Sequence, residues 1–367
     1  MNRSTLQPFA PGDVFVGATV LDDPADDHAG RGRILQYDAS LAPKGILWLE
    51  DTTHLVGGLS FDARGRLWAF DWQSFAVCAV HPDGRVERRD FGARPYSNVS
   101  FARDGTLYLG EHVAGDTIRP EIEARLETTL PHMPGTQRFG DGHVWHFRDD
   151  GTFIKEYATQ THGGLAGFLG VTHAVLSPDE SILCYCSETG PRLMRYDLKH
   201  DRQLPDLQSF PDGQREMFFG LCPGPGGVLY ALRGSRLDAI AATGTTVRTI
   251  PLPGSGWATI ALAPDGRTAC VGNFFTGELG RIDLDSGARL ATVQTGAARS
   301  LAGLAIFAAV PVRKRVLPRK KAQGRRRAVQ KRTPRNARAP GKPRGKKKAS
   351  PRKARRGRRP GRRALRG

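Results

Sequence analysis

A short pattern recurs along the first 310 residues of the chain: a pair of small residues, an apolar run, a turn rich in Asp, Gly and Pro, and a second apolar or aromatic run. Each copy predicts a β-hairpin, because two apolar runs of four to eight residues that flank such a turn form antiparallel strands. A second, more amphipathic hairpin follows each copy, such as VCAVHPDGRVERRDF after the first. The five copies occupy residues 57–71, 97–111, 172–187, 219–233 and 258–273.

Four strands about every 40 residues are typical of the blades of a β-propeller. The N-terminal part supplies three strands without an inner one, whereas the repeats are followed by a lone apolar stretch, SLAGLAIFAAV (300–310). We expect this stretch to complete the first blade, because a closed ring leaves no exposed sheet edge there. The predicted fold class is therefore all-β: a six-bladed propeller over residues 1–310, closed by the C-terminal strand, with a disordered basic tail over residues 311–367.

One blade carries an insertion between its second and third strands, residues 113–142, which includes the helix-like sequence IRPEIEARLETTL. Long insertions in otherwise tight repeats are commonly functional. The insertion begins directly after Glu111 and His112, at the end of a predicted second strand. We therefore expect it to cover one mouth of the central channel as a lid.

Polar residues at the start of the inner strands and at the end of the second strands should meet at one mouth of the channel, because the second strand returns to the side where the first began. These groups could form an acid/base or ligand pocket, or they could simply bond the backbone of neighbouring blades. The candidate catalytic residues are Asp71, Glu111, His112 and His173. The candidate ligand-binding residues are His54, Asn98, Ser187, Arg233 and Asn273.

The segment THAVLSPDESILCYCSETGPRLMRYDL (172–198) resembles the P-N-G-L-A-x-S-P-D-G hairpin of the senescence marker protein/gluconolactonase family, and similar hairpins occur in NHL propellers. The resemblance implies a six-bladed propeller that hydrolyses lactones with a divalent cation held by Glu, Asn and Asp. Carried over, these ligands fall on Val56 or Gly57, on Thr172 and on Phe219 or its neighbour, none of them a carboxylate or amide. Because such a cation needs several oxygen ligands, we predict no metal and no other cofactor, and a divalent cation is the less favoured alternative.

These observations favour a non-catalytic binding module that takes a small molecule or a protein at the propeller mouth. The alternative is a lactonase-like hydrolase or lyase with an atypical site at the channel mouth. Sequence alone leaves open the ligand or substrate and whether the protein is catalytic.

The last part of the chain is strongly basic. Residues 311–367 contain 27 of the 55 lysines and arginines and none of the 36 acidic residues, which leaves 28 basic and 36 acidic residues before them. Such a segment is expected to be disordered and to bind polyanions. It resembles the Lys/Pro/Ala-rich tails of linker histones, and residues 350–353 (SPRK) resemble their minor-groove unit. The predicted contacts to DNA or RNA are Arg325, Arg326, Arg327, Lys346, Lys347, Lys348, Arg352, Lys353, Arg355 and Arg356.

Besides nucleic-acid binding, the basic segment could serve as a tether to anionic lipids or as a nuclear import signal, or it could be a read-through product of G+C-rich DNA. The start of the sequence lacks the pattern of a secretory signal, and no apolar run is long enough to span a bilayer. We therefore expect a cytoplasmic monomer that is nucleoid-associated or nuclear if the tail is used.

Overall fold

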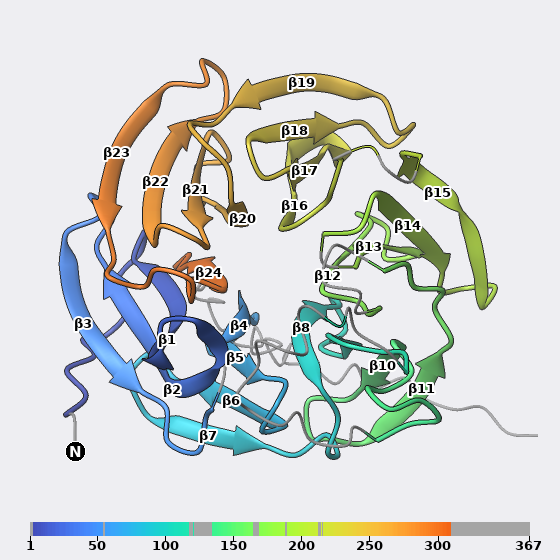
Figure 1. Cartoon of the computed structure of the whole chain (residues 1–367), viewed down its shortest axis with the longest axis horizontal. Coiled ribbons are helices and arrows are strands. Elements are labelled where there is room, and N and C mark those ends of the chain that lie inside the picture. Colours follow the sequence, from blue (N-terminus) through green and yellow to red (C-terminus); the bar gives the residue numbers. More distant parts are fainter. Residues whose placement is uncertain are drawn as a thin grey trace, which may run out of the picture. The chain divides into compact units, whose positions relative to one another are not determined.

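The computed structural model describes residues 3–53, 56–116, 120, 134–163, 169–187, 189–211, 214 and 216–309. The chain divides into two units, residues 1–312 and 313–367, and every described residue lies in the first. In this part of the chain, six four-stranded antiparallel sheets stand radially around a central channel (Figure 1). The predicted all-β, six-bladed propeller is confirmed.

Blade 1 is built from both ends of the first unit. From the channel outward, it consists of β24 (Gly303–Ile306), β1 (Val14–Asp23), β2 (Asp26–Tyr37) and β3 (Pro43–Trp48). The antiparallel pairing of β24 with β1 sets Ile306 opposite Val14 and Gly303 opposite Gly17. The expected closure of the ring by the C-terminal strand is thus confirmed.

The other five blades each use four consecutive strands, with the first strand innermost. They are β4 (Gly57–Phe61), β5 (Leu67–Asp71), β6 (Ala76–Val80) and β7 (Val86–Arg89); β8 (Tyr96–Phe101), β9 (Leu107–Glu111), β10 (Val144–Phe147) and β11 (Phe153–Tyr157); β12 (His173–Leu176), β13 (Ile182–Cys186), β14 (Arg192–Asp197) and β15 (Arg202–Ser209); β16 (Leu221–Pro223), β17 (Leu229–Leu232), β18 (Arg236–Ile240) and β19 (Thr246–Pro251); and β20 (Trp257–Leu262), β21 (Thr268–Asn273), β22 (Glu278–Asp283) and β23 (Arg289–Gln294).

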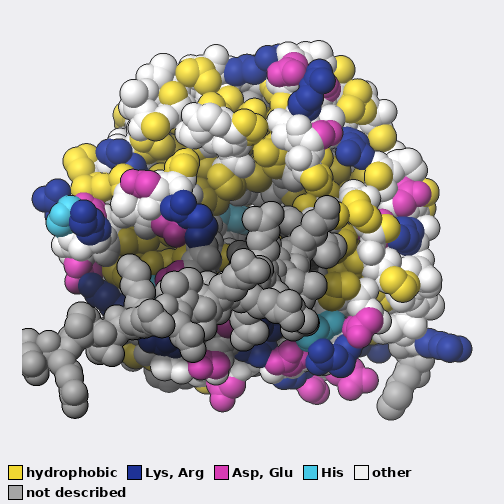
Figure 2. All heavy atoms as spheres, turned by 180° about the vertical axis from the view of Figure 1, so that it is seen from behind, with side chains coloured by type: hydrophobic (Ala, Val, Ile, Leu, Met, Phe, Trp, Pro, Cys, Tyr) yellow, Lys and Arg dark blue, Asp and Glu magenta, His cyan; other side chains and the backbone are white. Residues whose placement is uncertain are grey.

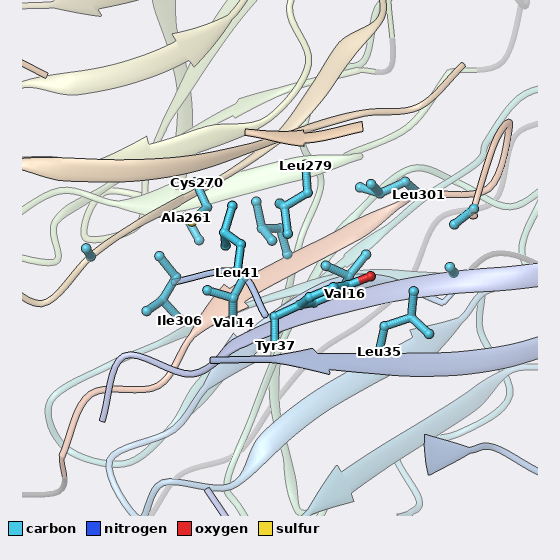
Figure 3. Close-up of a cluster of buried hydrophobic side chains, with 14 residues drawn as sticks. Val14, Val16, Leu35, Tyr37, Leu41, Ala261, Cys270, Leu279, Leu301 and Ile306 are labelled. Atoms are coloured by element: carbon cyan, nitrogen blue, oxygen red, sulfur yellow. The ribbon is translucent and has the colours of Figure 1, made fainter. Parts of the chain in front are cut away.

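The core is divided among the interfaces between neighbouring blades. Side chains alternate between the two faces of a strand, so the apolar second strands contribute to both neighbouring interfaces. In β5, Leu67 and Ala69 pack toward blade 1, whereas Trp68 and Phe70 pack toward blade 3. Figure 3 shows the interface between blades 6 and 1, where Tyr37 and Leu41 face Cys270 and other side chains of blade 6.

The inner strands approach one another closely where they begin. Gly58 has a φ of 61°, and a Cβ atom there would lie 1.7 Å from the carbonyl oxygen of Ser97 in the next blade. Only glycine combines a left-handed backbone with so close an approach. The contact between the two strands leaves no room for a side chain at position 58.

The insertion predicted as a lid is described only at its two ends. Ala114 forms isolated bridges with Asp141 and Leu169, and Phe139 is fully buried. The helix-like sequence within residues 118–130 lies almost entirely outside the described residues, so the lid stays a prediction. None of the helices formed by the described residues has the length and hydropathy needed to cross a membrane.

Candidate functional site

The central channel encloses a cavity of about 250 Å³ that is lined by the inner strands of all six blades. Among the lining residues, Gly58, Asn98, His173, Gly220 and Thr259 are the second residues of the five repeat copies, as the alignment predicts. Deeper in the channel the lining is mostly apolar, and it includes no charged side chain among the described residues. Figure 2 shows a hollow in the middle of one face, bordered by hydrophobic side chains.

Asn98 and Thr259 line this cavity, and their side chains carry buried polar atoms. The Asn98 Nδ2 atom donates hydrogen bonds to the carbonyl oxygens of Val171 (2.6 Å) and Thr172 (3.1 Å) at the start of blade 4. Its Oδ1 atom and the Oγ1 atom of Thr259 are buried, and neither has a hydrogen-bond partner within the described part of the chain. Both atoms are shielded from the cavity, and a buried polar atom without a partner is costly to the fold.

His173 is a titratable group on the channel wall. Burial lowers the pKa of its imidazole to about 4, so the ring is neutral at pH 7. A neutral imidazole offers one hydrogen-bond donor and one acceptor. The channel can therefore bind polar groups without a net charge of its own.

Protonation of His173 should weaken the fold in mild acid. The unfolded imidazole has a pKa near its ordinary 6.5 and takes up a proton before the folded one as the pH falls. The free energy of unfolding should therefore fall as the pH drops from about 6.5 to 4. We expect a loss of about 1–2 kcal/mol at pH 5, a range that allows for the partial exposure of the ring. Urea unfolding of the wild type and of His173→Gln at pH 7 and pH 5 measures this difference, and an identical pH dependence of both proteins would contradict it.

The candidate residues at the ends of the second strands form hydrogen bonds with nearby loops. The Asp71 carboxylate accepts hydrogen bonds from the backbone N–H groups of Thr53 (2.7 Å), Gln73 (3.0 Å) and Ser74 (3.2 Å). Asn273 does the same in blade 6: its Oδ1 accepts from the N–H groups of two turn residues, and its Nδ2 donates to a loop carbonyl. Both side chains thus hold the loops that surround the strand ends.

Ser187 and Arg233 are also engaged with loops. Ser187 Oγ donates to the carbonyl of Gly170 at 2.6 Å. The buried Arg233 guanidinium bonds the carboxylate of Glu216 (2.6 Å) and the carbonyl of Met217 (2.6 Å), and it lies over the ring of Phe218 at 4.0 Å. Burial lowers the pKa of Arg233, which Glu216 and Asp238 partly offset.

Glu111 is part of a buried ion pair. Its side chain is fully buried, its Oε1 accepts from Arg94 Nη1 at 2.7 Å, and its Oε2 accepts from the backbone N–H of His143 at 2.9 Å. The Arg94 guanidinium lies 3.6 Å over the Trp145 ring. These contacts fix the carboxylate between the second and third strands of blade 3.

The candidate residues therefore fall into two groups. Asn98 and His173 lie together on the channel wall, whereas Asp71, Glu111, His112, Ser187, Arg233 and Asn273 are not among its lining residues. His112 stacks on Trp72 with ring centroids 5.3 Å apart, and His54 lies outside the described residues. Within the described ranges, no three His, Cys, Asp or Glu side chains come close enough to hold a metal ion. Thr259 belongs with Asn98 and His173, and its place in the repeat copy is the signal that finds it.

Replacing Arg94 should reveal how far Glu111 depends on its ion pair. Arg94→Met leaves a fully buried carboxylate that keeps the hydrogen bond from the His143 N–H, and losing one member of a buried pair typically costs about 3–5 kcal/mol. Arg103→Met is the matched control, because Arg103 pairs with Glu180 while 72% exposed, and such surface pairs contribute about 0–1 kcal/mol. Equal losses of unfolding free energy in the two variants, measured in urea, would contradict a structural role of the Glu111 pair.

Comparisons with known proteins support the fold. No protein-family model matches the chain, and no curated protein does. Among solved structures, 1196 chains are similar. One belongs to the crystal structure of a nidogen/laminin complex: it aligns with a TM-score of 0.58 and 12% sequence identity, over 81% of this chain and 98% of that chain. At this identity the similarity shows a shared propeller fold and leaves the activity undetermined.

Proposed function

We propose that the protein is a non-catalytic interaction module whose propeller binds a partner at the channel mouth and whose basic tail attaches it to nucleic acid without reading sequence. The observation that carries this proposal is the separation of charge: 27 basic and no acidic residues in residues 311–367, beside a propeller channel whose described lining carries no charged side chain. A neutral channel and a polycationic segment suit two different partners.

The channel is suited to uncharged groups that form hydrogen bonds. Transferring a charge into an apolar channel without a counter-charge is costly, whereas the neutral imidazole of His173 can bond an uncharged polar group. The carboxylates that a hydrolase would need, Asp71 and Glu111, are occupied by backbone N–H groups and by Arg94. The similar chain in the nidogen/laminin complex is compatible with an interaction role for a propeller of this kind.

The basic segment is suited to phosphate backbones. It contains no Phe, Tyr or Trp on which bases could stack, and its many prolines disfavour a folded element that could read base edges. Binding would therefore rest on counterion release and be nearly independent of sequence. DNA and RNA share this chemistry, so either could be the partner.

Retention on immobilised duplex DNA and on single-stranded RNA tests the proposal. We expect the full chain to be retained at low salt and a chain ending at Val310 to pass through, because the shorter chain retains every strand of the propeller but loses 27 positive charges. Equal retention of the two chains would overturn the nucleic-acid part of the proposal. Retention on anionic lipid vesicles but on neither nucleic acid would replace it with a membrane tether.

Metal analysis of the purified full chain separates the interaction module from the lactonase-like alternative. We expect no stoichiometric divalent ion. An ion bound at one equivalent and lost in Glu111→Gln, in a variant that keeps the wild-type circular dichroism spectrum, would favour the enzyme.

A further inference from the structure

A second cavity, of about 110 Å³, lies between blades 4 and 5. Val175, Ile182 and Cys184 line it from blade 4, and Leu229 and Ile240 line it from blade 5. The exposed residues Pro178, Pro223 and Ala242 border it. It therefore opens on the face that carries the turns between first and second strands, away from the mouth where the inner strands begin.

The lining of this cavity is almost entirely apolar. Its charged member is Arg195, whose Nε and Nη2 atoms both donate to the carbonyl oxygen of Pro205, at 3.0 and 2.9 Å. Burial raises the pKa of the Cys184 thiol to about 11, so the sulfur is uncharged at pH 7. Cavities of this kind tend to stay dry and to accept apolar molecules.

The repeat explains why the space exists. Three residues before the last residue of the repeat copy, blades 2, 3 and 5 place a large aromatic side chain: Trp68, Tyr108 and Tyr230. Each of these rings packs in the interface with the following blade. Blade 4 has Cys184 at this position, in register with Val175 of the inner strand. The cavity thus lies where other blades insert an aromatic ring.

Blade 6 provides an internal comparison, since Cys270 occupies the same position there. In that interface Tyr37 and Leu41 of blade 1 belong to the same buried cluster as Cys270 (Figure 3). Blade 5 has the smaller residues Ile240 and Gly244 at the positions that correspond to Tyr37 and Leu41. Blade 5 therefore supplies less side-chain volume opposite Cys184 than blade 1 supplies opposite Cys270.

We propose that the cavity between blades 4 and 5 is a binding site for an uncharged ligand with a single aromatic ring. The cavity is somewhat smaller than an engineered apolar cavity of about 150 Å³ that binds benzene. The cavity lies at the position where blades 2, 3 and 5 place an aromatic ring, and Cys184 lines it. This cavity shares Val175 and Pro223 with the channel lining, and the proposal does not depend on the function inferred above.

Fluorobenzene is a suitable probe, followed by fluorine NMR and by thermal unfolding of the full chain. We expect saturable binding of one equivalent and a rise in melting temperature in the wild type. Cys184→Phe should fill the space and abolish the binding, whereas Cys184→Ala should keep it, because alanine leaves the cavity open. 4-Fluorobenzylammonium, which carries a positive charge, should not bind, since the described lining contains Arg195 but no carboxylate.

A second variant tests the same prediction if Cys184→Phe does not fold. Ala241→Leu adds a larger side chain at a position of blade 5 that lines the cavity. It should also abolish binding. Unsaturable fluorobenzene signals, or equal binding by the wild type and both filled variants, would overturn the proposal.

Discussion

A chain that ends at residue 299 should fail to fold cooperatively, although it keeps 23 of the 24 strands that the described residues form. Residues 301–307 contribute four large buried side chains, Leu301, Leu304, Ile306 and Phe307. Each such side chain contributes about 1.5–3 kcal/mol by burial, so their sum is comparable to the whole stability of a typical domain, about 5–15 kcal/mol. The truncation also exposes the edge of β1, an apolar strand that would be free to pair with other chains.

The chain ending at Val310 is the matched control for this prediction. It retains β24 and should give a cooperative urea transition, whereas the shorter chain should give none and should be cleaved rapidly by protease. Similar midpoints for the two chains would show that the ring does not depend on its closing strand.

The second large effect concerns salt. If the basic segment contacts 6–10 phosphates, the affinity of the full chain for DNA should fall by about 10³–10⁵ between about 50 and 200 mM salt. Replacing Arg325, Arg326, Arg327, Lys346, Lys347 and Lys348 by Gln removes six of the 27 positive charges. The slope of log affinity against log salt should then become shallower by up to about 5, since each phosphate contact contributes about 0.9.

Fluorescence anisotropy with duplexes of unrelated sequence measures this dependence. We expect the same slope for every duplex, because counterion release does not depend on the bases. As a control, Gln at six exposed basic residues of the propeller should leave the slope nearly unchanged, since residues 1–310 carry more acidic than basic residues. A slope near zero, or a large preference for one sequence, would contradict this mode of binding.

The blades and their closure are predictable from sequence because they depend on patterns that repeat. The apolar residues of β5 are buried when the strand lies between two other blades. The lone apolar stretch that forms β24 is buried when it pairs with β1. The positions on the channel wall follow from the same register, which is why Asn98, His173 and Thr259 can be placed by counting from the turns.

The environment of the strand-end residues is not predictable in this way. Asp71 and Glu111 occupy equivalent positions in the repeat. The Asp71 carboxylate accepts hydrogen bonds from loop N–H groups, whereas the Glu111 carboxylate pairs with Arg94. Their partners come from loops that differ in length and sequence from blade to blade. The cavity beside Cys184 is also not predictable from the sequence, because a cysteine in an apolar strand indicates a packed core. Only the neighbouring blade decides whether the space is filled, as Leu41 does for Cys270.

The pairing of β1 with β24 also affects when the protein can fold during its synthesis. Val14 and Ile306 are adjacent in the sheet but 292 positions apart in the chain. A ribosome that works from the N-terminus therefore releases β1 long before its inner neighbour exists. Until then, Val14, Phe15 and Val16 lack one side of their final packing, and contacts between such distant segments form slowly. Newly made chains should thus depend on chaperones until synthesis has passed residue 306, and crowding of nascent chains should favour pairing of β1 between molecules.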